Sequence, residues 1–297
     1  MQVDKAREAD TTSGSGAEPS GVVLLFVLSL TLLVVTGAAL TGLGLGAVAG
    51  TGARSRWWGT LLFIALPELL GLLVPALGFM AWNKQLGVLR GLLRGGAGQV
   101  AAGVLLGIGL FYFLAAWIEP WYEQLVRLSP SEQRALQRMI APPSGLRPLV
   151  LDLVTFALTP ALCEELLFRG AMLGSLLATR RESLPPESGL PPQPWTASPA
   201  FPVLLSALLF GMIHLSWGRL LPTMLLGVGF ALAVRRSGSL WPSIAMHAVN
   251  NTLVVLMVRH GKLSFSAFGD ATRLALLPLA ILFTALGIHL LRPRAPQ

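Results

Sequence analysis

The sequence is poor in charged residues and contains a single cysteine. Only 12% of its 297 residues are Asp, Glu, Lys or Arg, about half the share typical of soluble globular domains. The lone Cys163 excludes an internal disulfide and any metal or iron–sulfur site built on several cysteines. We interpret Cys163 as a small buried hydrophobe rather than a reactive thiol.

Long apolar segments make up most of the chain. The chain is 54% hydrophobic, with a mean hydropathy of +0.68. About 20 apolar residues span a bilayer as a helix, whereas barrel strands are shorter and alternate in polarity. The apolar segments cover residues 22–50, 59–82, 98–118, 149–177, 202–216, 220–235, 239–258 and 274–291. We therefore predict an all-α, polytopic membrane helix bundle, with eight spanning helices, or seven if the two short segments near residue 216 form one broken hairpin.

The net charge of +8 indicates a membrane environment rather than a nucleic-acid partner. The arginines lie mostly in short loops between apolar segments, where they anchor helices at the lipid surface. No basic cluster is interleaved with aromatic residues in the way that base stacking requires. Arginine outnumbers lysine and Ala, Gly and Leu are abundant, a composition typical of GC-rich bacteria, so we expect a multi-pass protein of the inner (plasma) membrane.

The chain divides into one large membrane domain and polar ends. Residues 1–20 are rich in Ser, Gly and Thr and predict a disordered tail, and residues 293–297 a short C-terminal tail. The membrane domain covers residues 21–292, and its first apolar segment is too long for a signal-peptide core. Two loops interrupt this domain: residues 119–148, with a predicted surface helix after a capping box, and the proline-rich residues 182–202.

Three charges stand inside the fourth apolar segment, at Glu164, Glu165 and Arg169. A charge near the bilayer centre costs about 2.5–3.5 kcal/mol even on insertion scales, so three of them indicate a site. Glu165 and Arg169 are four residues apart and share a helix face, which predicts an internal ion pair. Glu164 lies about 100° from Glu165 around the helix, so it is not part of this predicted pair and is a candidate for a functional role.

Further polar residues lie in later apolar segments. His214 ends the run that begins at Phe210, and His247 and Asn251 share a helix face by their spacing of four. A carboxylate and a histidine can deprotonate water, and a histidine and an asparagine can donate hydrogen bonds to an oxyanion. No serine or threonine accompanies a histidine in these motifs, so water is the expected nucleophile. Asn250 is expected to support its neighbour.

These residues form three ordered motifs. Glu164-Glu165-x-x-x-Arg169, Phe210-x-x-x-His214 and His247-x-x-x-Asn251 together resemble the CAAX prenyl endopeptidase family, also called the CPBP or abortive-infection family of intramembrane proteases. The similarity covers about residues 149–258. The first three apolar segments carry no motif of this family.

The resemblance implies an eight-helix bundle around a water-filled cavity. It further implies that Glu164 and His214 activate water, that His247 and Asn251 stabilise the oxyanion, and that Glu165, Arg169, Phe210 and Asn250 support them. Glu164, His214 and His247 also suit zinc, and the sequence does not decide between a metal-bound and a glutamate-activated water. In eukaryotic relatives the substrate is a prenylated Cys-a-a-X tail, so the implied partner is a prenylated or other membrane-associated peptide.

Two other functional classes compete with the protease. One is a non-proteolytic membrane scaffold or bacteriocin-immunity-like protein that keeps the same fold. The other is a transporter that uses Glu164 and the histidines as a proton relay. The absence of an internal repeat with matched broken helices argues against the transporter.

Overall fold

Helices account for the architecture of the described chain, in which no strand occurs. The computed structural model describes residues 18–42, 64–126, 130, 146–182, 198, 200–260 and 269–291. In chain order its elements are α2 (Pro19–Gly42), α5 (Leu66–Glu68), η3 (Leu69–Leu73), α6 (Val74–Trp82), α7 (Leu86–Leu92), α8 (Ala97–Phe113), η4 (Leu114–Ile118), α9 (Glu119–Leu125), α11 (Leu146–Leu153), η5 (Val154–Leu158), α12 (Thr159–Glu165), η6 (Leu166–Leu173), α13 (Gly174–Glu182), α15 (Phe201–Met212), α16 (Trp217–Ser237), α17 (Trp241–Arg259) and α18 (Gly269–Leu290). The predicted all-α membrane bundle is confirmed.

Several predicted features fall outside the described residues. These are residues 1–17 of the tail, the surface helix expected after residue 129, most of the proline-rich loop, and residues 293–297. Residues 19 and 20, which we assigned to the tail, already belong to α2.

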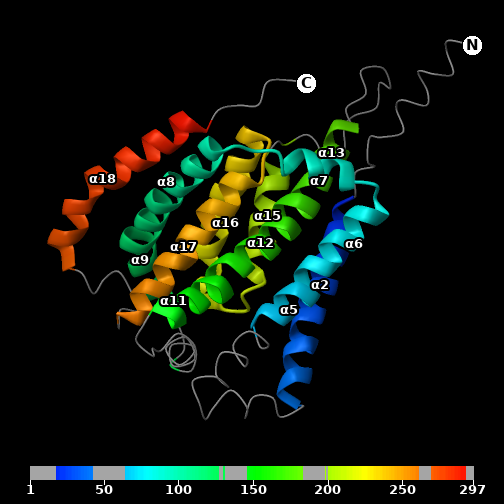
Figure 1. Cartoon of the computed structure of the whole chain (residues 1–297), viewed down its shortest axis with the longest axis horizontal. Helices are drawn as coiled ribbons and strands as arrows, with labels where there is room; N and C mark the ends of the chain where they lie inside the picture. The colour runs from blue at the N-terminus through cyan, green and yellow to red at the C-terminus, as the bar shows by residue number, and fades with distance from the viewer. Residues whose placement is uncertain are drawn as a thin grey trace, which may run out of the picture.

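The helices lie side by side in a bundle with α2 near one edge and α18 at the other (Figure 1). α18 packs on α8, α8 packs on α17, and α15 packs on α16, while α2 packs on η3. The most apolar windows of α2 and α18 are only 22% and 11% buried within the protein. Exposed apolar faces of this length suit lipid, so these two helices form outer walls and the polar motifs lie between them.

Five described helices are long and apolar enough to cross a membrane, or six if one bent pair counts as a span. The predicted count of eight is therefore not confirmed. The helical run from residue 146 to 182 carries the three motif charges, and α15 is only 12 residues long, about 18 Å against a hydrocarbon core of about 30 Å. α15 and α16 are two helices that pack on each other.

One predicted loop boundary is wrong, and one short helix was not predicted. Residues 119–125 were expected to start a loop, but α9 continues the helix of α8 and η4 without a break. After the second apolar segment the chain forms α7, bent by 119° from the preceding helix. The hydropathy signal missed both because each short stretch is less apolar than the helix before it.

Prolines inside two helices are preceded by widened π-helical turns. η5 ends two residues before Pro160, and η4 ends two residues before Pro120. A proline has no N–H to donate and its ring clashes with the carbonyl four residues earlier, so a wider turn relieves the conflict without ending the helix. The widened turns keep α11 to α13 and α8 to α9 continuous, and both runs contribute to the site.

Close backbone approach holds the walls of the site together. A Cβ added at Gly103 of α8 would lie 2.4 Å from the Pro242 carbonyl oxygen of α17. Only glycine allows this contact between the two helices. Just before α17, the turn from α16 passes through Gly238, whose φ of 63° is left-handed and favours glycine.

Candidate active site

The first motif lies on the long helix that includes α12 and η6. Glu165 is the last residue of α12, and Arg169 lies in the π-helical segment η6. Both side chains are 0% exposed, and Glu164 is 7% exposed. Because π-helical turns are rare and concentrate at functional sites, the placement of Arg169 within one agrees with the reading of this motif as a site.

Glu165 is the centre of a buried charged network. Its Oε1 accepts a hydrogen bond from Arg169 Nη1 at 2.8 Å and another from His247 Nδ1 at 3.1 Å. Arg169 Nη2 donates to the Gly227 carbonyl oxygen of α16 at 3.1 Å. The expected Glu165–Arg169 ion pair is therefore present. Its extension to His247 was not foreseen, and it joins the first motif to the third.

Aromatic rings enclose this network. The Arg169 guanidinium carbon lies 4.3 Å from the Phe210 ring centroid and 5.1 Å from that of Phe230, distances at which cation–π attraction operates. Phe230 also stacks on His247, with centroids 5.2 Å apart and an interplanar angle of 24°. Phe210 meets the His247 ring edge-on at 5.6 Å. The rings exclude water from the ion pair and fix the orientation of His247.

The backbone of Phe210 positions the second motif histidine. His214, in the turn after α15, has its Nδ1 at 3.0 Å from the Phe210 carbonyl oxygen. A carbonyl oxygen only accepts, so Nδ1 carries the proton and donates. In the neutral ring Nε2 then keeps its lone pair. His214 is therefore in the tautomer that can accept a proton from water at Nε2.

Asn250 and Asn251 interact within the third motif. Asn250 Nδ2 donates to Asn251 Oδ1 at 3.1 Å. With its oxygen engaged, Asn251 has its amide N–H groups available to other acceptors. This contact agrees with the expected supporting role of Asn250.

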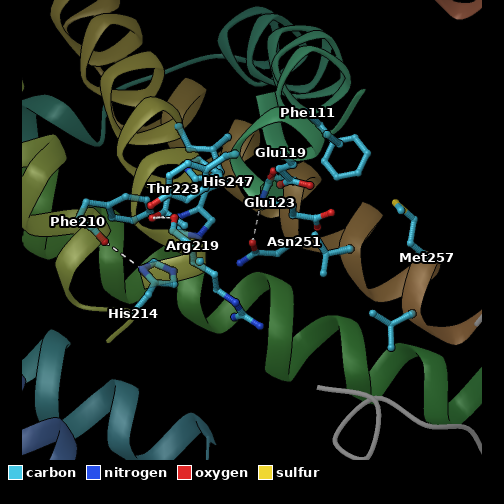
Figure 2. A pocket seen from close by; sticks show the side chains of 18 residues that line it. Phe111, Glu119, Glu123, Phe210, His214, Arg219, Thr223, His247, Asn251 and Met257 are labelled. Atoms are coloured by element: carbon cyan, nitrogen blue, oxygen red, sulfur yellow. Dashed lines mark hydrogen bonds between the residues drawn. The ribbon is translucent and has the colours of Figure 1, made fainter. Parts of the chain in front are cut away.

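One cavity of about 200 Å³ brings the second and third motifs together. Figure 2 shows His214, His247 and Asn251 gathered around it with Phe210 and Thr223. The polar and charged side chains among its lining residues are Glu119, Tyr122, Glu123, His214, Arg219, Thr223, His247, Asn250 and Asn251. A cavity with this lining can hold water and a peptide bond beside two imidazoles and a carboxamide.

Glu164, the expected catalytic carboxylate, is not among the residues that line this cavity. It is buried one residue from Glu165, and its Oε2 has no hydrogen-bond partner in the described part of the chain. Glu68, at the end of α5, acts electrostatically on both Glu164 and Cys163. Cys163 is buried, as expected. The structure thus brings His214, His247 and Asn251 together, and places Glu164 next to the Glu165–His247 contact.

Sequence reasoning missed three charged cavity residues. Glu119 and Glu123 come from α9, and Arg219 from the first turn of α16. The two glutamates are four residues apart, a spacing that places them on one helix face, but assigning residues 119–148 to a loop hid that signal. Arg219 was assigned to the gap between two segments, where an arginine usually contacts water or lipid headgroups.

The described residues do not form a metal site as they lie. No three His, Cys, Asp or Glu side chains in the described ranges come close enough to share a metal ion. The zinc set expected from Glu164, His214 and His247 would also require Glu164 to join the two histidines at the cavity. We therefore derive no step through a metal, and zinc stays a prediction for metal analysis.

The fold and the cavity define a class: a multi-pass helical membrane protein with a polar site inside the bundle. Residues 146–253 match the family model described as Type II CAAX prenyl endopeptidase Rce1-like. The resemblance drawn from the three motifs is confirmed, and it implies the fold of CAAX-type intramembrane proteases. Comparisons with curated proteins and with solved structures gave no match.

Proposed function

We propose that this chain is an intramembrane endopeptidase that hydrolyses a peptide bond near the C-terminus of a prenylated or other membrane-associated substrate. The observation that carries the proposal is that His214, His247 and Asn251, separated in sequence, line one cavity within the bundle. The match of residues 146–253 to the Rce1-like family model supports a protease in a lipid environment. The composition supports the inner membrane of a bacterium as its location.

In the proposed reaction a cavity water attacks the scissile carbonyl carbon. Its proton passes to His214 Nε2, with Glu164 as the carboxylate that assists, and the new C–O bond forms as the carbonyl oxygen becomes an oxyanion. The C–N bond then breaks, and the proton is delivered to the leaving amine. The products are a new carboxylate and a short peptide with a new N-terminus. Glu164 has to turn toward the cavity for this role, and its unpartnered Oε2 leaves it free to do so.

His247 and Asn251 are the proposed oxyanion donors. Glu165 engages His247 Nδ1, so only Nε2 of this ring can face the substrate. We propose that this nitrogen donates the hydrogen bond to the oxyanion, while the contact with Glu165 orients the ring. The Asn251 amide supplies the second donor.

A cleavage assay with the purified full-length chain tests the proposal. The substrate is a synthetic tail peptide with a farnesylated cysteine, and products are identified by mass spectrometry. Glu164→Gln and His214→Ala should each abolish cleavage while the protein stays folded. Full cleavage activity in either variant refutes the role assigned to that residue. Absence of cleavage by the wild-type chain, with biological activity retained in Glu164→Gln, favours the non-proteolytic scaffold. Metal content and activity, measured with and without a chelator, decide whether zinc takes part.

A further inference from the structure

Arg219 is the cavity residue that neither the motifs nor the proposed chemistry uses. It lies in the first turn of α16, is half-buried, and lines the same cavity as His214 (Figure 2). Among the described residues its guanidinium makes no hydrogen bond and no ion pair, whereas the guanidinium of Arg169 donates to Glu165 and to the Gly227 carbonyl oxygen. A guanidinium carries five N–H donors in a planar fork that matches a carboxylate. Within the described cavity these donors are available to a ligand.

The helix α9 is held next to the start of α16, where Arg219 lies. Tyr122 Oη donates to the Trp217 carbonyl oxygen at 2.7 Å, which ties α9 to the start of α16. Glu119 and Glu123, on the same helix as Tyr122, line the same cavity as Arg219. Arg219 acts electrostatically on Glu119 and on His214, but it forms no ion pair with either glutamate. The guanidinium is thus held near the site without being neutralised by direct contact.

We propose that Arg219 binds the free C-terminal carboxylate of the substrate and so makes the enzyme specific for bonds close to a chain end. This inference rests on the proposed function and names its substrate class. Because Arg219 and His214 line one cavity of about 200 Å³, only a short stretch of peptide fits between the carboxylate and the attacked bond. An internal segment of a membrane protein has no carboxylate to offer and is excluded by the same geometry.

The two glutamates of α9 on this cavity provide a second, independent test of this inference. Glu119 and Glu123 repel an incoming carboxylate and attract Arg219, so they weaken the binding of the acid end. Neutralising Glu119 should strengthen that binding, whereas neutralising Arg219 should weaken it. If Arg219 had only a structural role, neutralising it and neutralising Glu119 would not change the binding of the acid peptide in opposite directions. The effect would also be the same for peptides that end in an acid or an amide.

The test uses two farnesylated peptides that differ only at their ends, one a free acid and the other a C-terminal amide. A hydrogen bond to a charged group contributes about 1.5–3 kcal/mol, which corresponds to about tenfold to hundredfold in affinity. The wild-type chain should prefer the acid by this factor, through KM rather than kcat. Arg219→Gln should remove the preference, Arg219→Lys should keep part of it, and Glu119→Gln should lower KM for the acid alone.

Controls separate the failure of this inference from failure of the proposed function. Arg90→Gln, on the exposed face of α7 and outside the cavity lining, should keep the full preference. Binding of fluorescently labelled acid and amide peptides to Glu164→Gln is measured alongside cleavage. Equal binding, or an Arg219→Gln effect of the same size on both peptides, overturns the carboxylate assignment. Loss of cleavage with preserved preferential binding overturns only the proteolytic function.

Discussion

Replacing Glu165 by glutamine should destabilise the fold, whereas the same change at Glu164 should not. Glu165→Gln leaves the Arg169 guanidinium charged and 0% exposed, with neutral groups as its contacts: the new amide, the Gly227 carbonyl oxygen and the aromatic rings. Removing one partner of a buried ion pair typically costs about 3–5 kcal/mol. Glu164 forms no ion pair with a described residue, and its Oε2 has no hydrogen-bond partner, so a neutral glutamine there removes a buried charge without breaking a contact.

Thermal unfolding in detergent measures this difference. At about 2–4 °C per kcal/mol for a chain of this size, Glu165→Gln should lower Tm by about 6–20 °C. Glu164→Gln should keep Tm within about 2 °C of the wild type. In the cleavage assay both variants should be inactive, the first because His247 loses its anchor and the second because the water loses its assisting carboxylate.

A double variant separates lost charge balance from lost packing. Glu165→Leu combined with Arg169→Met removes both charges and fills the space between the rings with apolar side chains, a change that is often neutral or stabilising for buried pairs. Most of the Tm lost in Glu165→Gln should return, while activity stays absent. The reasoning is refuted if Glu165→Gln melts together with the wild type, or if the double variant is less stable than the single one.

Two further predictions concern the oxyanion donor and the packing of the cavity wall. Asn251→Ala should lower kcat by about 10²–10³-fold with little change in KM. Asn250→Ala should have a smaller effect because it acts through its neighbour, and equal losses in steady-state kinetics would contradict these roles. Gly103→Ala should lower Tm because its methyl group would overlap the Pro242 carbonyl. The matched Gly98→Ala meets open space on the same helix and should leave Tm unchanged or slightly higher. Similar Tm values for the two variants would contradict the close approach of α8 to α17.

The four-residue spacing predicted the ion pair of Glu165 and Arg169 but not the contact of Glu165 with His247. The four-residue separation of Glu165 and Arg169 fixes a shared helix face, because the geometry of a helix is the same wherever it occurs. The contact from Glu165 to His247 joins residues 82 positions apart. It depends on how α12 meets α17, and no periodicity in either segment contains that information. Sequence spacing correctly divided the two glutamates, but it did not show that Glu165 also orients a proposed catalytic histidine.

The hydropathy pattern was most informative where segments are long and least informative at their ends. It located the helices that cross the bundle, since about 20 apolar residues in a row have few alternatives in a membrane. It failed at α9 and α7, where polar residues continue a helix that burial against neighbours stabilises. Glu119 and Glu123 were missed for this reason, although their spacing of four was visible.

The sequence by itself determined that this chain is an all-helical membrane protein and that its motif segment resembles CAAX-type proteases, because apolar length and the order of three motifs need no knowledge of packing. Only the tertiary structure decided which polar groups share a cavity. It gathered His214, His247 and Asn251, placed Arg219 on the same cavity as Glu119 and Glu123, and set Glu164 outside the cavity lining. The physical reason is that helix faces are local properties, whereas the side chains that meet across a bundle depend on crossing points such as the contact of Gly103 with Pro242.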